Sequence, residues 1–135
     1  VKANVSEGNL TSISKSWPIG SILSLEQENN IKKVDFLKID VEGYEYYVLK
    51  GAENLLKTNP EIIILFECAE HLAKRAESTQ QAVFSFLNNL GIEIAGWNEQ
   101  DKKWSTNIFE AMKSGQLVGG RNIMTVLNNL SSLKN

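Results

Sequence analysis

The chain has 135 residues, a net charge of −2 and a sequence pI near 5.5, so it is about one domain long and has no excess of basic residues. That charge argues against nucleic acid as its main partner. The longest apolar run, residues 62–66, is far too short to cross a bilayer, and the single cysteine cannot form an internal disulfide, so we expect no membrane partner and a reducing, cytoplasmic location.

The N-terminal part of the chain contains little regular pattern. Residues 1–20 are rich in Ser, Thr, Asn and Lys, and we expect an irregular lead-in with a short strand at residues 1–5. Ser24 and Gln27 have the spacing of a capping box, which predicts a short helix at residues 21–29.

Residues 34–41 give the first strong strand signal. Their apolar residues suit a strand that is covered on both faces, yet Lys38 lies in the middle, where a charge costs several kcal/mol unless it is paired. Because side chains alternate along a strand, Lys38 and Asp40 share a face and can form a pair. Two interpretations stay open: a pair that only fixes local geometry, or a Lys38 that orients Asp40 as a general base or ligand contact.

A helix and a second strand are predicted next. Apolar residues recur at helical spacing over residues 44–57, with Gly51 as the place for a kink or close packing, and Asn59-Pro60 ends the helix. Residues 61–67 are then predicted to be a second buried strand, built around the Ile-rich run.

The rest of the chain alternates in the same way. The predicted elements are a helix at 79–90 that Gly91 ends, a strand at 92–97, a polar loop at 98–103, a helix at 106–113, a strand at 121–127 and a polar tail at 128–135. This alternation predicts a single α/β domain over residues 1–135 with a doubly wound, mainly parallel sheet. Only three other strands are predicted with a clear pattern, which leaves one edge of strand 34–41 without a neighbour. The strand that pairs with this edge must come from outside the chain or from the N-terminal segment.

Acidic residues follow both buried strands. Glu42 and Gly43 lie in the turn after the first strand, and Glu67 ends the second. The carboxyl ends of parallel strands meet at one rim, where open α/β sheets bind ligands, and neighbouring strands lie ~4.8 Å apart. Asp40 and Glu67 could therefore face one site, while Glu45 is expected to interact with the N-terminus of its own helix.

Two nearby residues have alternative interpretations. His71 could join Asp40 and Glu67 around a divalent ion, but the spacing matches no recognised metal motif, so we expect no metal and a solvated loop position for His71. Cys68 could be reactive, although a small apolar filler is the favoured interpretation. The sequence contains no glycine-rich phosphate loop and no nucleophile elbow.

Several segments together resemble the FkbM family of methyltransferases: residues 34–43, Glu45, residues 48–52, Pro60 and residues 63–67. The resemblance implies a Rossmann-like sheet, here the part of a class I methyltransferase fold that contains strands four to seven. Residues 34–41 would be strand four, residues 61–67 strand five, and the last strand would be antiparallel. It also implies S-adenosylmethionine as the cofactor and O-methylation of a hydroxyl on a sugar or secondary metabolite.

The same resemblance assigns catalytic roles to three residues. Asp40 would lie beside the transferred methyl group, Asp40 or Glu42 would accept the proton of the hydroxyl, and Lys38 would hold Asp40 in place. On the substrate side, the rim of the site would be formed by Gly43, Glu67 and His71.

The cofactor side of such a site is missing from this sequence. The family's glycine-rich turn after strand one and acid after strand two have no counterpart here, so the cofactor-binding residues are unknown. We expect the chain to be the C-terminal half of the catalytic domain and to be inactive alone. The missing N-terminal half or a second copy of the chain would then cover the edge of strand 34–41.

Two other functions fit parts of the sequence. A non-catalytic α/β interaction module, or a degenerate enzyme half, remains the alternative. Residues 36–40 also look like a strand motif of cyclic-dinucleotide phosphodiesterases of the EAL type, but that barrel needs roughly 250 residues and the chain has no Glu-Ala-Leu tripeptide.

Overall fold

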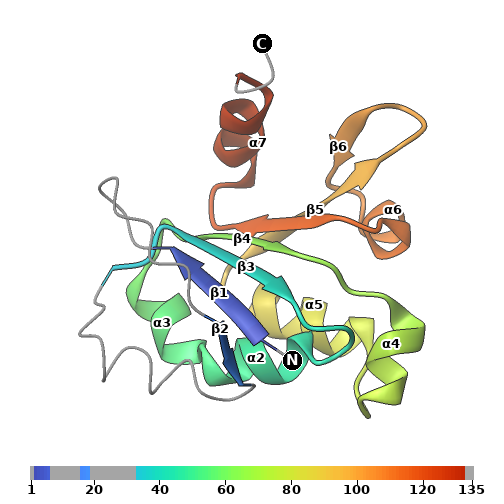
Figure 1. Ribbon diagram of the computed structural model, residues 1–135. Helices are drawn as coiled ribbons and strands as arrows, with labels where there is room; N and C mark the ends of the chain where they lie inside the picture. Colours follow the sequence, from blue (N-terminus) through green and yellow to red (C-terminus); the bar gives the residue numbers. More distant parts are fainter. Residues whose placement is uncertain (1, 7–15, 19–32, 133–135) are drawn as a thin grey trace.

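The computed structural model describes residues 2–6, 16–18 and 33–132, and in this part of the chain one sheet organises the fold (Figure 1). The strands are β1 (Lys2–Ser6), β2 (Ser16–Pro18), β3 (Phe36–Asp40), β4 (Ile63–Phe66), β5 (Glu93–Asn98), β6 (Lys103–Ser105) and β7 (Leu117–Gly120). The helices are α2 (Glu45–Gly51), α3 (Glu53–Thr58), α4 (Glu70–Arg75), α5 (Gln80–Asn89), α6 (Ile108–Lys113) and α7 (Ile123–Ser132). The strand order is β2-β1-β3-β4-β7-β5-β6.

Most neighbouring strands are antiparallel, so the prediction of a mainly parallel, doubly wound sheet is wrong. In the described residues only β3 and β4 pair in parallel. Short connections explain part of the difference, because the turn at residues 99–102 returns the chain beside β5 as β6. Since β7 is antiparallel to both of its neighbours, β3, β4 and β5 still run in one direction. The α/β class is confirmed, and so is the antiparallel direction of the last strand, although that strand, β7, lies at other residues than predicted.

The edge of β3 is occupied by the N-terminal segment. β1 pairs antiparallel with β3 from Lys2 opposite Asp40 to Ser6 opposite Phe36, and β2 pairs with β1. Of the two sources of a partner strand left open by the sequence, the structure uses the one within the chain. The short strand predicted at residues 1–5 is therefore confirmed as β1, and the described part of the lead-in adds β2, which was not predicted. The helix predicted at residues 21–29 lies outside the described residues.

Helices cover the two faces of the sheet unequally. In Figure 1, α2, α3 and α5 lie on one face and α7 lies on the other. The larger core joins β3 and β4 to α2, α3 and α5, through residues such as Leu37, Ile64, Leu49, Leu56 and Leu87. The smaller core joins β5 and β7 to α7, with Ala95, Val118, Ile123 and Val126 as its buried members.

Lys38 is exposed, so its predicted burial is wrong. Leu37 and Ile39 face the larger core, whereas Lys38 and Asp40 point to the other face of β3 and are exposed. No described ion pair joins Lys38 to Asp40. Alternation identified the shared face correctly, but the desolvation cost that made a pair necessary does not arise there.

Several element boundaries differ from prediction. The helix predicted at 44–57 is divided into α2 and α3 at Ala52, one residue after Gly51. For α5 the prediction is confirmed: the Thr79 side chain accepts a hydrogen bond from the Ala82 N–H at 3.0 Å, and Gly91 follows with φ 77°. The helix α4 was not predicted.

The strand predicted at residues 121–127 is wrong, and so is the start of the polar tail. The strand lies earlier, as β7, and residues 123–132 form α7. Gly119 and Gly120 are the last two residues of β7, and a larger residue would be crowded there, because a Cβ would come within 3.1 Å of Ile92 and 3.0 Å of Val126. None of the helices in the described ranges is long and apolar enough to span a membrane.

Arg121 joins three segments through main-chain carbonyls. Its guanidinium donates to the oxygens of Leu90 (3.1 Å), Asn59 (3.2 Å) and Leu56 (2.6 Å). We expect Arg121→Ala to lower the free energy of unfolding by about 3 kcal/mol, because a charged donor is lost and partly buried acceptors are left unpaired. Urea denaturation measures this, with exposed Arg75→Ala as the control, and a loss equal to that of the control would contradict it.

Candidate functional site

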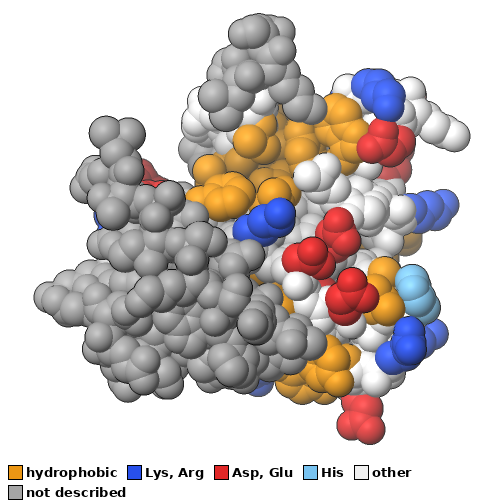
Figure 2. Space-filling view, in the orientation of Figure 1, with side chains coloured by type: hydrophobic (Ala, Val, Ile, Leu, Met, Phe, Trp, Pro, Cys, Tyr) orange, Lys and Arg blue, Asp and Glu red, His pale blue; other side chains and the backbone are white. Residues whose placement is uncertain are grey.

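A small acidic pocket lies where β3 and β4 end. Its cavity of about 80 Å³ is lined by Asp40, Glu42, Glu45, Glu67, Cys68, Ala69, Leu72, Ser114 and Gly115. Because β3 and β4 are parallel, with Ile39 opposite Phe66, the residues that follow this pair, Asp40 and Glu67, lie side by side. Figure 2 shows acidic side chains gathered on this face beside an apolar area. The structure thus brings Asp40, Glu42 and Glu67 together.

The turn after β3 has an unusual backbone. The Tyr44 N–H donates to the Val41 carbonyl at 3.3 Å, and the two residues between them have positive φ, 53° at Glu42 and 105° at Gly43. A non-glycine residue in this region stores about 1–3 kcal/mol of strain, and such residues cluster at functional sites. A Cβ at Gly43 would also overlap the main-chain carbonyl of Leu72 in α4. The predicted tight turn and close backbone approach therefore occur together at Gly43.

The side chain of Glu45 stabilises this turn through a hydrogen bond. Its side chain is buried, and Oε1 accepts a hydrogen bond from the Gly43 N–H at 3.1 Å. Burial raises the pKa of Glu45 above its usual value of 4.5, the charge of Asp40 adds to this, and backbone hydrogen bonds oppose it. The sequence indicated only a helix-terminus role for Glu45, although its place two residues after the turn could have suggested this contact.

The raised pKa of Glu45 predicts the sign of a pH effect on stability. The folded chain disfavours the ionised carboxylate of Glu45. The protonated carboxyl therefore contributes its full share to the free energy of unfolding below the unfolded-state pKa, and this share is lost as the pH rises through the folded-state pKa. We therefore expect Glu45→Gln to gain stability relative to the native chain as the pH rises from about 4 to 8. Urea unfolding at a series of pH values measures this, with exposed Glu61→Gln as the control; an opposite slope would contradict the burial effect.

Gln80 links the two walls of the pocket, and no sequence signal pointed to it. This buried side chain donates through Nε2 to the carbonyls of Cys68, at the end of β4, and of Met112 in α6, the latter at 2.8 Å. Its main-chain N–H donates to Glu70 Oε2 at 3.0 Å. These bonds hold the segment after β4 against the segment that carries Ser114.

Cys68 is not an activated nucleophile. Burial raises the pKa of its thiol to about 12, and the negative charges of Glu45 and Glu70 add to the effect. Since the thiolate is the reactive form, this thiol is inert at neutral pH. The structure favours the interpretation of Cys68 as a small apolar filler.

Three residues predicted for the site do not line the pocket: Gly43, which lies in the turn described above, Lys38 and His71. Lys38 is exposed on β3, and His71 is exposed on α4 rather than in a loop. Asp40, Glu67 and His71, which the sequence allowed but did not favour as metal ligands, do not form such a set: among the described residues, no three His, Cys, Asp or Glu side chains are arranged to hold a metal ion.

The pocket's composition limits its chemistry. Four of its nine lining residues are carboxylic acids, and none is Lys or Arg. Such a site can accept a proton from a bound hydroxyl or attract a cationic group. Its volume is well below the roughly 300–1,000 Å³ of pockets that hold whole small molecules, so only one end of a cofactor-sized ligand fits.

Comparison with known families gives one finding. A family model described as the methyltransferase FkbM domain matches residues 17–94, which is more than half of the chain. The matched segment includes every acid of the pocket, whereas Ser114 and Gly115 lie beyond it. Comparisons with curated proteins and with solved structures give no match.

Proposed function

The chain belongs to the FkbM methyltransferase family, and from this premise we propose that it supplies the acceptor-side half of an S-adenosylmethionine-dependent O-methyltransferase. The acceptor is a hydroxyl of a sugar or secondary metabolite. The chain is then the C-terminal part of a Rossmann-like catalytic domain, with strands four to seven of the class I fold, in a reducing, cytoplasmic setting.

The observation that carries this proposal is the convergence of Asp40, Glu42 and Glu67 on one cavity. Methyl transfer to a hydroxyl needs an oxygen held in line and a group that accepts its proton as attack proceeds. Asp40 suits the second role best, because it ends β3 and its backbone is paired with β1. Glu42 is the second candidate, since its strained backbone directs a carboxylate to the same cavity.

The pocket fits the reacting end of S-adenosylmethionine and not the whole molecule. Its acids complement a positively charged sulfonium group, and Asp40 and Glu42 would face that end. When bound, the cofactor supplies the methyl group. A cavity of about 80 Å³ leaves no room for its nucleoside, which supports the proposal that the main cofactor-binding residues lie outside this chain.

Calorimetric titration tests the half-site part of the proposal. We expect the 135-residue chain to bind S-adenosylmethionine with a Kd weaker than about 1 mM, because most of the contact surface is missing. Micromolar affinity for this chain would overturn the half-site proposal and leave the family assignment intact.

Transfer of a radiolabelled methyl group tests the reaction itself. The complete polypeptide that contains this chain is incubated with labelled S-adenosylmethionine and a panel of glycans and small alcohols. A labelled methyl group bonded to an oxygen of an acceptor supports O-methylation. Label on nitrogen or sulfur alone would contradict the proposed acceptor class.

A further inference from the structure

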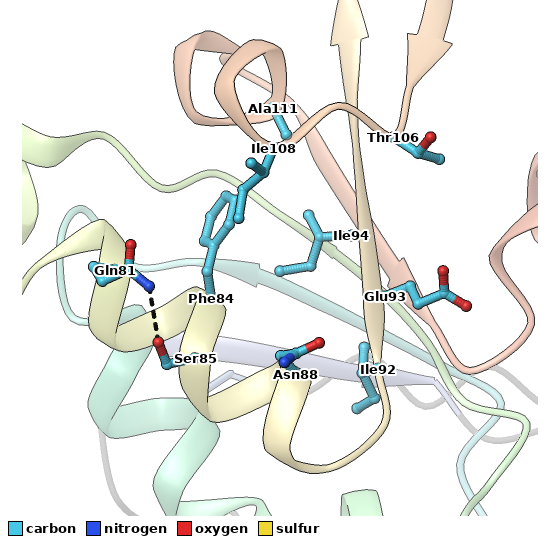
Figure 3. A pocket seen from close by; sticks show the side chains of 10 residues that line it. All are labelled: Gln81, Phe84, Ser85, Asn88, Ile92, Glu93, Ile94, Thr106, Ile108 and Ala111. Atoms are coloured by element: carbon cyan, nitrogen blue, oxygen red, sulfur yellow. Dashed lines mark hydrogen bonds between the residues drawn. The ribbon is translucent and has the colours of Figure 1, made fainter.

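A second hollow lies beside the outer part of the sheet and shares no residue with the acidic pocket. This groove, of about 290 Å³, runs between α5, β5 and α6 (Figure 3). Its lining residues are Gln81, Phe84, Ser85, Asn88, Ile92, Glu93, Ile94, Thr106, Ile108 and Ala111. Aliphatic and aromatic side chains form its floor, and neutral polar side chains form most of its rim.

The groove follows an open stretch of sheet edge. β7 pairs with residues 93–96 of β5, but β6 pairs only with residues 96–98 on the opposite side. In the described part of the chain, no strand lies beside residues 93–95 on that side. β6 does not extend beside residues 93–95, because the chain turns into α6 after Ser105. The Asn107 N–H donates to Ser105 Oγ at 3.2 Å, and the Asn107 side chain caps α6.

The backbone of Ile94 faces this open edge. The Trp97 N–H donates to the Gln116 carbonyl at 3.0 Å, on the β7 side. In an antiparallel pair the N–H and C=O groups of successive residues point to opposite sides, so those of Ile94 point away from β7. An unpaired donor and acceptor at a sheet edge are a template for an added strand.

The side chains beside this edge define what an added strand should carry. Ile94 points into the groove toward Phe84 and Ile108, and the Ile108 side chain is 48% exposed (Figure 3). A residue paired with Ile94 places its side chain on the same face, so a bulky apolar side chain would fill the groove. The following residue of an antiparallel strand lies opposite Glu93, an exposed acid that favours Lys or Arg.

A second copy of the chain does not suit this edge. If two β5 strands paired antiparallel about Ile94, β6 of each copy would collide with residues 90–92 of the other, since β6 occupies the same edge only two residues further along. A short extended segment that starts at the residue paired with Ile94 and runs on beside residues 93–91 does not reach β6.

We propose that the open edge of β5 binds an extended peptide segment of a partner protein, in line with β6. The segment carries a bulky apolar residue at the position paired with Ile94 and a basic residue after it. This interaction is independent of the methyltransferase proposal, because it uses neither the acidic pocket nor a cofactor.

The probe is the capped peptide acetyl-Ile-Lys-Thr-Ser-amide, which starts at the residue paired with Ile94 and so does not reach β6, and its matched control carries an N-methyl group on the Ile nitrogen. We expect the probe to slow hydrogen exchange of the Ile94 amide by about fivefold or more at saturation, as read by NMR of the ¹⁵N-labelled chain. The N-methylated peptide should give no protection, because it lacks the donor for the Ile94 carbonyl. Equal effects of both peptides would overturn strand addition.

Two neighbouring substitutions test the groove. Ile108→Arg should weaken peptide binding about tenfold or more, whereas Phe109→Arg should change it less than about twofold, because Phe109 is 72% exposed and does not line the groove. Spectra and urea midpoints show whether both variants fold. Unchanged Ile94 exchange at about 5 mM peptide would overturn the proposal, as would self-association through residues 93–95 without peptide.

Discussion

Asp40→Asn is expected to lower the turnover of methyl transfer in the complete enzyme by about 10²- to 10⁴-fold, the usual contribution of a general base. Asn has the same shape as Asp but cannot accept the proton released by the acceptor hydroxyl. Asp40 ends β3 and lines the acidic pocket, so the substitution leaves the strand pairing with β1 and β4 in place. Initial rates with labelled S-adenosylmethionine, at saturating acceptor, measure the effect on kcat.

Asp35→Asn is the matched control for this measurement. Asp35 lies just before the other end of the same strand and forms an exposed ion pair with Lys33 at 3.5 Å. The same chemical change there should alter turnover by less than about twofold, because exposed ion pairs contribute little. If Asp40→Asn also stays within about twofold, Asp40 is not the base, and Glu42→Gln becomes the decisive variant.

The largest effect on stability is expected for Gly43→Ala, with a loss of about 3 kcal/mol or more in the free energy of unfolding. Two costs add at this position. An L-residue at φ 105° is strained, and its Cβ would overlap the Leu72 carbonyl, which belongs to rigid main chain in α4. Because the turn also positions Glu42, the same variant should lose methyl transfer.

Two other glycines separate these costs. Gly91 has φ 77°, but no atom lies within 4 Å of the position that a Cβ would take, so Gly91→Ala should cost only the backbone strain, about 1–2 kcal/mol. Gly115 has neither a positive φ nor a neighbour within 4 Å, so Gly115→Ala should be neutral or slightly stabilising. Urea denaturation of the three variants checks the order. A Gly43→Ala loss no larger than that of Gly91→Ala would show that α4 moves away without cost.

Local patterns predicted the parts of this protein that local forces determine. The period of α5 and its stop at Gly91 follow from helix geometry and backbone sterics within a dozen residues. The convergence of Asp40 and Glu67 followed from one assumption, that two buried strands are parallel neighbours, and that assumption is confirmed.

Predictions that required knowledge of a distant partner were less reliable. Alternation correctly placed Lys38 and Asp40 on one face of β3, but it cannot tell whether another element covers that face, and none of the described elements buries Lys38. The strand predicted at 121–127 misses Gly119 and Gly120, whose small size is required by Ile92 and Val126, and those two residues come beside them only when the chain folds. Gln80 gave no signal, since both carbonyls that it binds are brought to it by tertiary packing.

The sequence by itself determined the α/β class, the family and the acids at the ends of the two buried strands, because these depend on short-range periodicity and on a contiguous motif. Only the tertiary structure decided the antiparallel order of the sheet, the exposure of Lys38, the place of Glu45 in the wall of the acidic pocket and the hydrogen bonds of Gln80 behind that wall. Strand order and burial depend on which surfaces meet after the chain folds, and no local pattern contains that information.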